Sequence, residues 1–271
     1  MQTSLQASAM PPHAFVEEYH GGGHQVTFKG KGGYSRIKAR CELSDLLVVV
    51  YDRQTKDARL AYIQAKSERS VPASTSGVHG RRLAANLEQW DLLGRRPKIT
   101  GVGRFNPPSD LLSGAQLKSV GSFVFFLHGA QGVDIQYAAA SDLTLPPRTY
   151  STSSGTLNVP PDRCQCRPNP ECLSVYGSAA FGSFLFGLMI GTPILCSGNP
   201  ATPSNAWLAA QLRGFAAGAK GGGPLATELA GLLDPARTDR ARSPSVGAAT
   251  LLLFSVGPAG PQSRRVSPSR M

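Results

Sequence analysis

The sequence predicts an α/β protein, and three patterns in its first half carry that prediction. Residues 46–51 are an almost unbroken aliphatic run, typical of a central strand buried on both faces. Residues 58–66 form a second strand pattern after a short polar turn, so the two strands are expected to pair as an antiparallel hairpin. Residues 82–93 carry apolar side chains at helical spacing, and Gly94 is a suitable stop for that helix.

Length and composition limit the number of domains, the loop content and the kind of binding partner. With 271 residues, the chain can form one large domain or one domain with a smaller lobe. The apolar content is 41%, and 30 Gly with 21 Pro favour an ordered core interrupted by long loops. A formal charge of +11 indicates a polyanionic partner, most simply nucleic acid, although a basic tail that confers only solubility would give the same total.

Cysteine usage and the N-terminus favour a reducing, cytoplasmic location. The chain has five cysteines, an odd number, and its first residues are polar rather than a secretory apolar segment. Cys164, Cys166 and Cys172 lack the second ligand pair of a zinc site and are interpreted as reduced thiols in a loop. Residues 173–212 carry no charge, but glycines and a proline interrupt them, so we expect a buried helix and no membrane partner.

Further elements are expected on both sides of the hairpin. Turn residues and local periodicity predict their ends. The expected helices cover 13–20, 175–190, 206–217 and 225–233, and the expected strands or extended segments cover 25–29, 34–41, 98–105, 122–128, 134–140 and 248–256. The resulting divisions are an α/β core over 12–145, a loop over 146–172, a C-terminal mainly helical portion with a final strand over 173–256, and a disordered basic tail over 257–271.

Three polar side chains of the hairpin are placed to meet. Asp45 opens the first strand, whereas Gln64 and Lys66 lie near the end of the second. Alternate residues of a strand share a face, so Gln64 and Lys66 point to the same side of the sheet. A carboxylate, an amide oxygen and an ammonium group at one sheet edge suit a divalent metal and a scissile phosphate.

Asp45, followed along the chain by Gln64-Ala65-Lys66 on an apolar strand, resembles the PD-(D/E)xK nuclease superfamily. The Gln-x-Lys variant is similar to that of methylation-dependent restriction endonucleases and related resolvase-like enzymes. The resemblance covers residues 13–105. It implies a restriction endonuclease-like fold, with a mixed central sheet flanked by helices, and DNA cleavage that depends on Mg²⁺, or on Mn²⁺ in its place.

Carried over by residue, Asp45 takes the place of the first acid of the motif, Gln64 that of its Asp or Glu, and Lys66 that of its lysine. Asp45 and Gln64 would therefore be the metal ligands. Two departures stand out, because the first motif lacks its proline and an amide replaces a carboxylate. With one negative charge fewer, we expect metal binding that is either weaker or more dependent on bound DNA.

An upstream acid on a first helix often completes such a site. Glu17 is the preferred candidate over Glu18. Glu42 is the other option, although it lies three residues before Asp45 and would join only if the strand bends.

Basic residues around the hairpin are candidates for contacts to DNA phosphates, and a solvated basic face is the alternative interpretation. These candidates are Lys29, Lys31, Arg36, Lys38, Arg40, Arg81 and Arg82. The sequence thus predicts a Mg²⁺-dependent DNA endonuclease-like hydrolase, in restriction or defence. The alternative is a catalytically inactive protein of the same fold that binds nucleic acid or a protein. The oligomeric state is open, with a homodimer as one option.

Overall fold

The computed structural model describes residues 12–19, 22–68, 81–129, 132–146, 153–165, 170–194, 203–217 and 223–234. The strand predicted at 248–256 and the tail predicted at 257–271 lie outside these residues.

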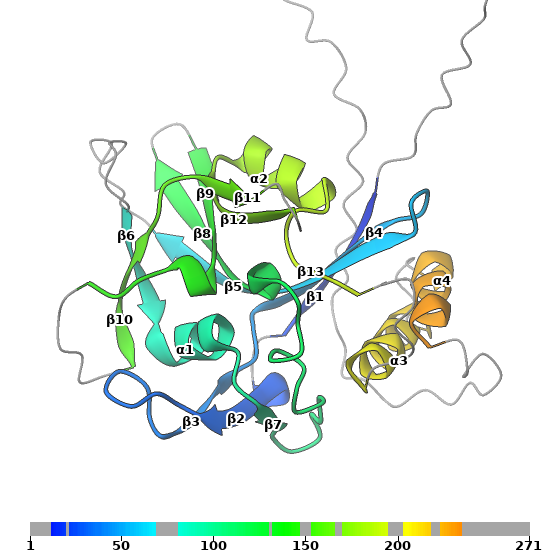
Figure 1. The fold of residues 1–271 in the computed structure, drawn as a ribbon, viewed down its shortest axis with the longest axis horizontal. Helices are drawn as coiled ribbons and strands as arrows, with labels where there is room; N and C mark the ends of the chain where they lie inside the picture. The colour runs from blue at the N-terminus through cyan, green and yellow to red at the C-terminus, as the bar shows by residue number, and fades with distance from the viewer. Residues whose placement is uncertain are drawn as a thin grey trace, which may run out of the picture.

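An eight-stranded mixed sheet forms the centre of the molecule (Figure 1). Its main path is β1-β4-β5-β8-β9-β12-β11, and β13 pairs with β5 off this path. Neighbouring strands are antiparallel except β5 and β8, which are parallel. The strands are β1 (His13–Glu18), β4 (Leu46–Asp52), β5 (Asp57–Glu68), β8 (Gly121–Gly129), β9 (Gly132–Ala139), β11 (Arg163–Gln165), β12 (Glu171–Tyr176) and β13 (Thr192–Pro193). The mixed α/β class and the β4–β5 hairpin are confirmed.

The parallel pair needs a crossover, and helix α1 (Leu87–Arg95) lies within it. The Asn86 side chain caps α1 by accepting from the backbone N–H groups of Glu88 and Gln89. Arg96 ends the helix in the left-handed conformation, with φ 53°. The helix begins later than the predicted residue 82, because β6 (Arg81–Asn86) pairs with β10 (Ser154–Val159) instead of joining α1.

Two small sheets flank the centre. β2 (Gln25–Lys29) lies between β3 (Lys38–Glu42) and β7 (Ile99–Gly101), and β6 with β10 forms the other sheet. Short 3₁₀ turns occupy Gly22–His24, Lys118–Val120 and Ala140–Asp142. The strand expected at 25–29 is confirmed, whereas the segments expected at 34–41 and 98–105 are strands over only part of their length.

The helix predicted over 13–20 is wrong, because residues 13–18 pair with β4 as strand β1. That pairing buries Ala14 on one face of the sheet and Phe15 with Glu17 on the other. The loop expected over 146–172 is also wrong in part, since β10 and β11 lie within it. Tertiary pairing outweighs the local propensities of both segments.

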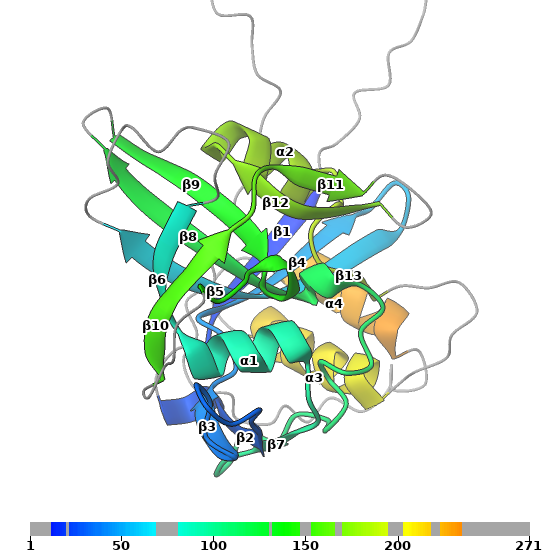
Figure 2. The same cartoon turned by 60° about the vertical axis from the view of Figure 1, so that its left-hand side comes forward.

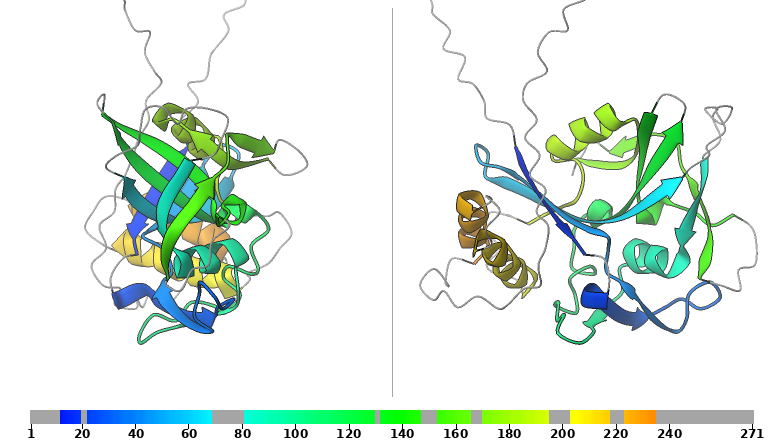
Figure 3. Two further views of the ribbon diagram at one scale, coloured as in Figure 1. Left: turned by 90° about the vertical axis from the view of Figure 1, so that its left-hand side faces the viewer. Right: turned by 180° about the vertical axis from the view of Figure 1, so that it is seen from behind.

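In the described segments after β12, the helices are α2 (Ser178–Phe186), α3 (Pro203–Ala217) and α4 (Gly223–Leu233). The helix expected from 175 starts at 178, because β12 joins the main sheet. α3 and α4 match their predictions and pack together beside β4 (Figure 3), where the Tyr51 hydroxyl bonds the Glu228 carboxylate at 2.9 Å. None of the helices in the described segments has the length and apolarity that a membrane crossing requires.

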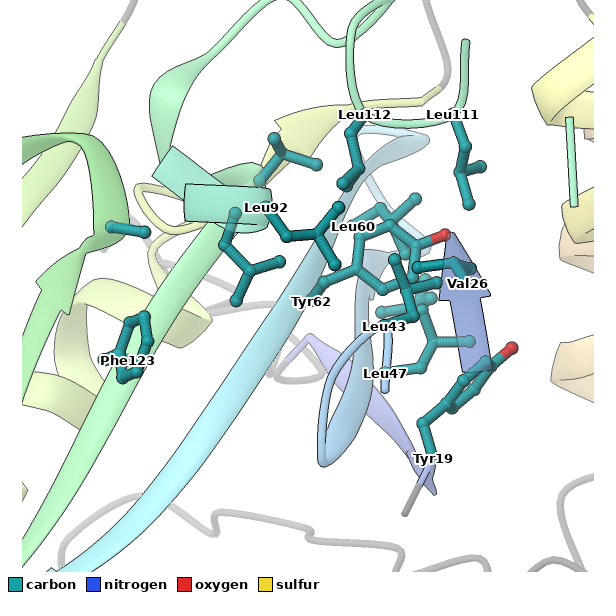
Figure 4. Close-up of a cluster of buried hydrophobic side chains, with 14 of the residues drawn as sticks. Tyr19, Val26, Leu43, Leu47, Leu60, Tyr62, Leu92, Leu111, Leu112 and Phe123 are labelled. Carbon is teal, nitrogen blue, oxygen red and sulfur yellow. The ribbon is translucent and has the colours of Figure 1, made fainter. Parts of the chain in front are cut away.

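Each face of the main sheet has its own apolar core. On one face, Leu47, Tyr62 and Phe123 pack with Leu92 of α1 (Figure 4). On the other face, Ile63 and Tyr137 belong to a second cluster, which α2 covers (Figure 2). Because α1 and the β3-β2-β7 sheet cover the first face, polar side chains on that face are enclosed except at its edges.

Candidate active site

Backbone hydrogen bonds fix Asp45 at the start of β4. Its N–H donates to the Ile63 carbonyl of β5 at 3.1 Å. Its own carbonyl accepts from the Tyr19 N–H, just after β1, at 2.7 Å. Asp45 is therefore tied to both neighbouring strands, and its side chain starts from a rigid position.

The side chains predicted to converge do so at one oxygen atom. Asp45 Oδ2 accepts a hydrogen bond from the Gln64 side-chain amide and another from the Ala65 N–H at 2.8 Å. Lys66 Nζ lies 3.9 Å from the same oxygen. The Asp45 and Lys66 side chains are 21% and 28% exposed, so the Asp45–Gln64–Lys66 cluster opens to solvent on one side.

Gln64 is the buried member of this cluster. The residue is fully enclosed, and its Oε1 atom has no hydrogen-bond partner. A buried carbonyl oxygen without a partner costs about 1–3 kcal/mol. Because the amide nitrogen faces Asp45, rotation of the amide by a half turn would bring Oε1 towards the carboxylate. That arrangement is favourable only with a cation between the two oxygens.

Glu17 lies close to this cluster in the sheet but is not bonded to it. It stands opposite Leu47, which stands opposite Tyr62, in the row of side chains adjacent to Asp45 and Gln64. Glu17 is 1% exposed, and neither carboxylate oxygen makes a hydrogen bond of ordinary geometry. Burial raises its pKa to about 8, against a smaller opposing effect of the Tyr19 hydroxyl. We therefore expect Glu17 to be protonated at neutral pH.

The other upstream acids lie elsewhere. Glu18 alternates with Glu17 along β1, is exposed, and points to the opposite face of the sheet. Glu42 lies in β3, opposite Gln25 of the small sheet, rather than in the strand of Asp45. Of the three candidates, Glu17 alone shares the face of Asp45 and Gln64 within the main sheet.

Three of the predicted DNA contacts have partners inside the protein. The Arg36 guanidinium binds both carboxylate oxygens of Glu88, at 2.7 and 2.8 Å. Arg40 donates to Gln25 at 2.7 Å, and Arg81 lies over the Tyr176 ring at 4.3 Å. The three side chains that the sequence suggests for phosphate binding are therefore engaged in contacts within the protein.

The remaining basic candidates are Lys29, Lys31, Lys38 and Arg82, which are exposed and form no ion pair within the described part of the chain. Of these, Arg82 can be placed relative to strand β5. β6 adjoins the end of β5, where the Glu68 carboxylate accepts from the Ala84 N–H at 2.7 Å. Arg82 therefore lies near the end of the strand that carries Lys66.

Two buried acids of α1 were missed from the sequence. Glu88 bonds Arg36, and Asp91 bonds Arg95 at 2.7 Å and the Lys31 N–H at 3.0 Å. Hydrogen bonds from Arg36 lower the pKa of Glu88, and Arg95 and Lys31 lower that of Asp91 against its burial. The i,i+4 spacing of Asp91 and Arg95 is a readable signal, whereas the contact of Arg36 with Glu88 is long-range.

In the segments that the structure describes, no three His, Cys, Asp or Glu side chains are grouped to hold a metal ion. No family model matches the chain, and no curated protein or solved structure shows significant similarity to it. The function of the site is therefore inferred from its own residues.

Proposed function

We propose that the protein is a metal-dependent phosphodiester hydrolase that acts on DNA. The observation that carries this proposal is the convergence of Gln64, Ala65 and Lys66 on one carboxylate oxygen of Asp45. An acid, a second oxygen donor and a cation at one solvent-open point are the parts that such hydrolysis requires. The mixed sheet flanked by helices supports a restriction endonuclease-like fold.

The oxygen donors present fit a hard divalent cation. Asp45 offers a carboxylate, and Gln64 Oε1 is a buried oxygen without a hydrogen-bond partner. Mg²⁺ binds through one or two carboxylates and keeps several waters or substrate phosphate oxygens, so a sparse protein ligand set suffices. When bound, Mg²⁺ or Mn²⁺ would lower the pKa of a water and offset phosphate charge. With a single carboxylate, we expect ion binding to strengthen when DNA is present.

The protein's own groups prepare the site for the attacking water. The Ala65 N–H holds the Asp45 carboxylate in one orientation. Lys66, partly exposed beside that carboxylate, is placed to orient the water and to stabilise the negative charge that develops on the phosphate. Arg82 and the exposed lysines would bind flanking phosphates in a salt-dependent manner.

One observation favours a second function, DNA or protein binding without cleavage. In the structure, the Gln64 amide donates its hydrogen to Asp45, and Glu17 stays buried outside the cluster. If this arrangement persists when DNA binds, the cluster is a structural hydrogen-bond network. Binding would then be salt-sensitive and independent of metal.

Nicking of supercoiled plasmid separates the two functions. The full chain is incubated with Mg²⁺, Mn²⁺ or a chelator, alongside Asp45→Asn, Lys66→Met and the control Lys118→Met, an exposed lysine of the 3₁₀ turn before β8. Hydrolysis predicts metal-stimulated nicking that both site variants lose and the control keeps. Nicking that survives in both folded site variants contradicts the proposal, and metal-independent binding without nicking supports the second function.

A further inference from the structure

Two cysteines face each other at the edge of the main sheet. Cys164 of β11 lies directly opposite Cys172 of β12 in the antiparallel register, and the two Sγ atoms are 3.3 Å apart. Cys164 is exposed, whereas Cys172 is fully buried. These thiols lie in paired strands and not in the loop that the sequence predicts.

We propose that Cys164 and Cys172 form a dithiol oxidation site, which closes to a cross-strand disulfide on reaction with a low-molecular-weight disulfide such as glutathione disulfide. Directly opposed residues of an antiparallel pair have Cα atoms about 4.5–5.5 Å apart. A disulfide needs a Cα separation of about 4.4–6.8 Å, so the bridge can form without separating the strands. The register shift between Arg163 and Cys164 gives the shorter strand room to adjust.

The different exposure of the two thiols assigns their order of reaction. Cys164, as the thiolate, attacks one sulfur of glutathione disulfide, so a Cys164–glutathione bond forms and one glutathione thiolate leaves. The Cys172 thiolate then attacks the Cys164 sulfur and releases the second glutathione thiolate. The two protons from the protein thiols go to the two glutathione thiolates. The protein dithiol is oxidised by two electrons, and glutathione disulfide is reduced to two glutathiones.

The surroundings of the buried thiol suit the second role. Burial, followed by the contact with Cys164, raises the pKa of the Cys172 thiol, which makes it a poor first nucleophile. Its contact with Cys164 nevertheless gives it a high effective concentration once the mixed disulfide has formed. Cys41 is a different case, because it is buried and its thiol pKa is raised to about 12, chiefly by burial.

Formation of the disulfide would fix strand β11 at the edge of the main sheet. β11 has three residues, all exposed, and β12 is its partner in the sheet. β12 is well anchored, since Glu171 accepts from the Ser119 N–H at 2.6 Å and the Cys172 N–H donates to the Met189 carbonyl at 2.6 Å. Oxidation therefore links an exposed edge strand to a fixed one, and the amide protons of β11 should exchange more slowly in the oxidised protein.

The test uses the full chain with Cys166→Ser and Cys196→Ser, two cysteines outside the described residues. This parent is equilibrated with reduced and oxidised glutathione, quenched with an alkylating agent, digested and analysed by mass spectrometry. We expect peptides joined through Cys164 and Cys172 with the loss of two hydrogens. Glutathione bound to Cys164 should be roughly tenfold lower than in the same chain with Cys172→Val, which cannot resolve the adduct.

Two further variants complete the design. In the Cys164→Ser variant, Cys172 should stay unmodified. In the wild-type chain, which keeps Cys166, the 164–172 link should be more abundant than any 164–166 link. Circular dichroism of Cys172→Val checks that the fold survives. A stable glutathione adduct at Cys164 in the parent, a dominant 164–166 link, or no reaction at Cys164 would overturn the proposal.

Discussion

Glu17 in the sheet and Glu88 in helix α1 are buried almost equally, with 1% and 2% of their surface exposed, yet their pKa values move in opposite directions. Burial raises the pKa of Glu17 to about 8, and the Tyr19 hydroxyl opposes that rise only in part. Two guanidinium hydrogen bonds from Arg36 lower the pKa of Glu88.

The difference shows that low solvent exposure alone does not decide the ionisation of a buried acid, because a charged partner can outweigh the effect of burial. Glu88 is a structural acid, which ties the basic segment before β3 to α1. Glu17 has no cationic partner of this kind among the described residues and lies one row from the Asp45–Gln64–Lys66 cluster. Strongly shifted pKa values are concentrated at functional sites, so Glu17 is a candidate functional acid beside this cluster.

The largest expected effect is that of Glu17 ionisation on the free energy of unfolding. Its folded pKa of about 8 exceeds the ordinary value of 4.5, so the folded chain keeps a proton that the unfolded chain loses. The free energy of unfolding should therefore fall by about 1.4 kcal/mol per pH unit as pH rises from about 4.5 to about 8. Glu17→Gln should remove this dependence on pH and raise the free energy of unfolding by on the order of 4 kcal/mol at pH 8.

Urea unfolding of both proteins at four pH values between 5 and 8 measures this slope. Glu18→Gln, the exposed neighbour on the other face of β1, is the matched control and should leave the slope in place. Parallel pH profiles for wild type and Glu17→Gln would show that Glu17 is ionised in the folded protein.

A smaller effect is expected when a second acid is placed beside Asp45. Gln64→Glu puts a buried carboxylate next to the Asp45 carboxylate and should destabilise the metal-free protein by about 2–3 kcal/mol. Mg²⁺ should recover that loss, because ligand charge raises cation affinity. Thermal unfolding with and without Mg²⁺ tests this, and Gln64→Leu, which adds no charge, should show no such recovery. Equal Mg²⁺ shifts in wild type, Gln64→Glu and Gln64→Leu would argue against an ion at this cluster.

Glu88→Gln, which removes the charge, should lower the free energy of unfolding by less, about 1–2 kcal/mol. The reason is that its partner Arg36 is largely exposed and remains solvated. The pKa of Glu88 is lowered, so its stabilising contribution is present above pH 4.5 and is lost as pH falls through the lowered value. Wild type and Glu88→Gln should therefore converge in stability at acid pH, the opposite trend to Glu17. Asp57→Asn, at an exposed acid, serves as the control, and a constant difference down to low pH would contradict the ion pair.

The smallest expected effect on stability is that of Lys66→Met. Lys66 is 28% exposed and lies 3.9 Å from Asp45, so the change in unfolding free energy should stay below about 1 kcal/mol. DNA nicking, by contrast, should fall by roughly 100-fold or more if Lys66 stabilises charge on the reacting phosphate. Measuring both quantities on one preparation separates the two roles. A loss of stability that matches the loss of nicking would indicate a structural lysine.

The β4–β5 hairpin and the meeting of Asp45, Gln64 and Lys66 could be predicted, because strand periodicity and a short turn are local features. The strand at 13–18 could not, since apolar residues followed by two acids satisfy a helix as well as a strand until β4 pairs with them. Of the strands within 146–172, β10 depends likewise on a distant partner, β6, whereas β11 pairs with β12, which follows it directly in the chain.

Strand periodicity predicts which side chains of the hairpin share a face, and therefore that an acid, an amide and a lysine meet at its edge. The pairing of Glu88 with Arg36, 52 residues away, and the enclosure of Glu17 without such a partner in the described part of the chain follow from the folded arrangement instead. The two kinds of effect differ in their range along the chain. The face that a strand residue occupies follows from its neighbours in the chain, whereas a pKa depends on groups that folding brings together from far along the chain.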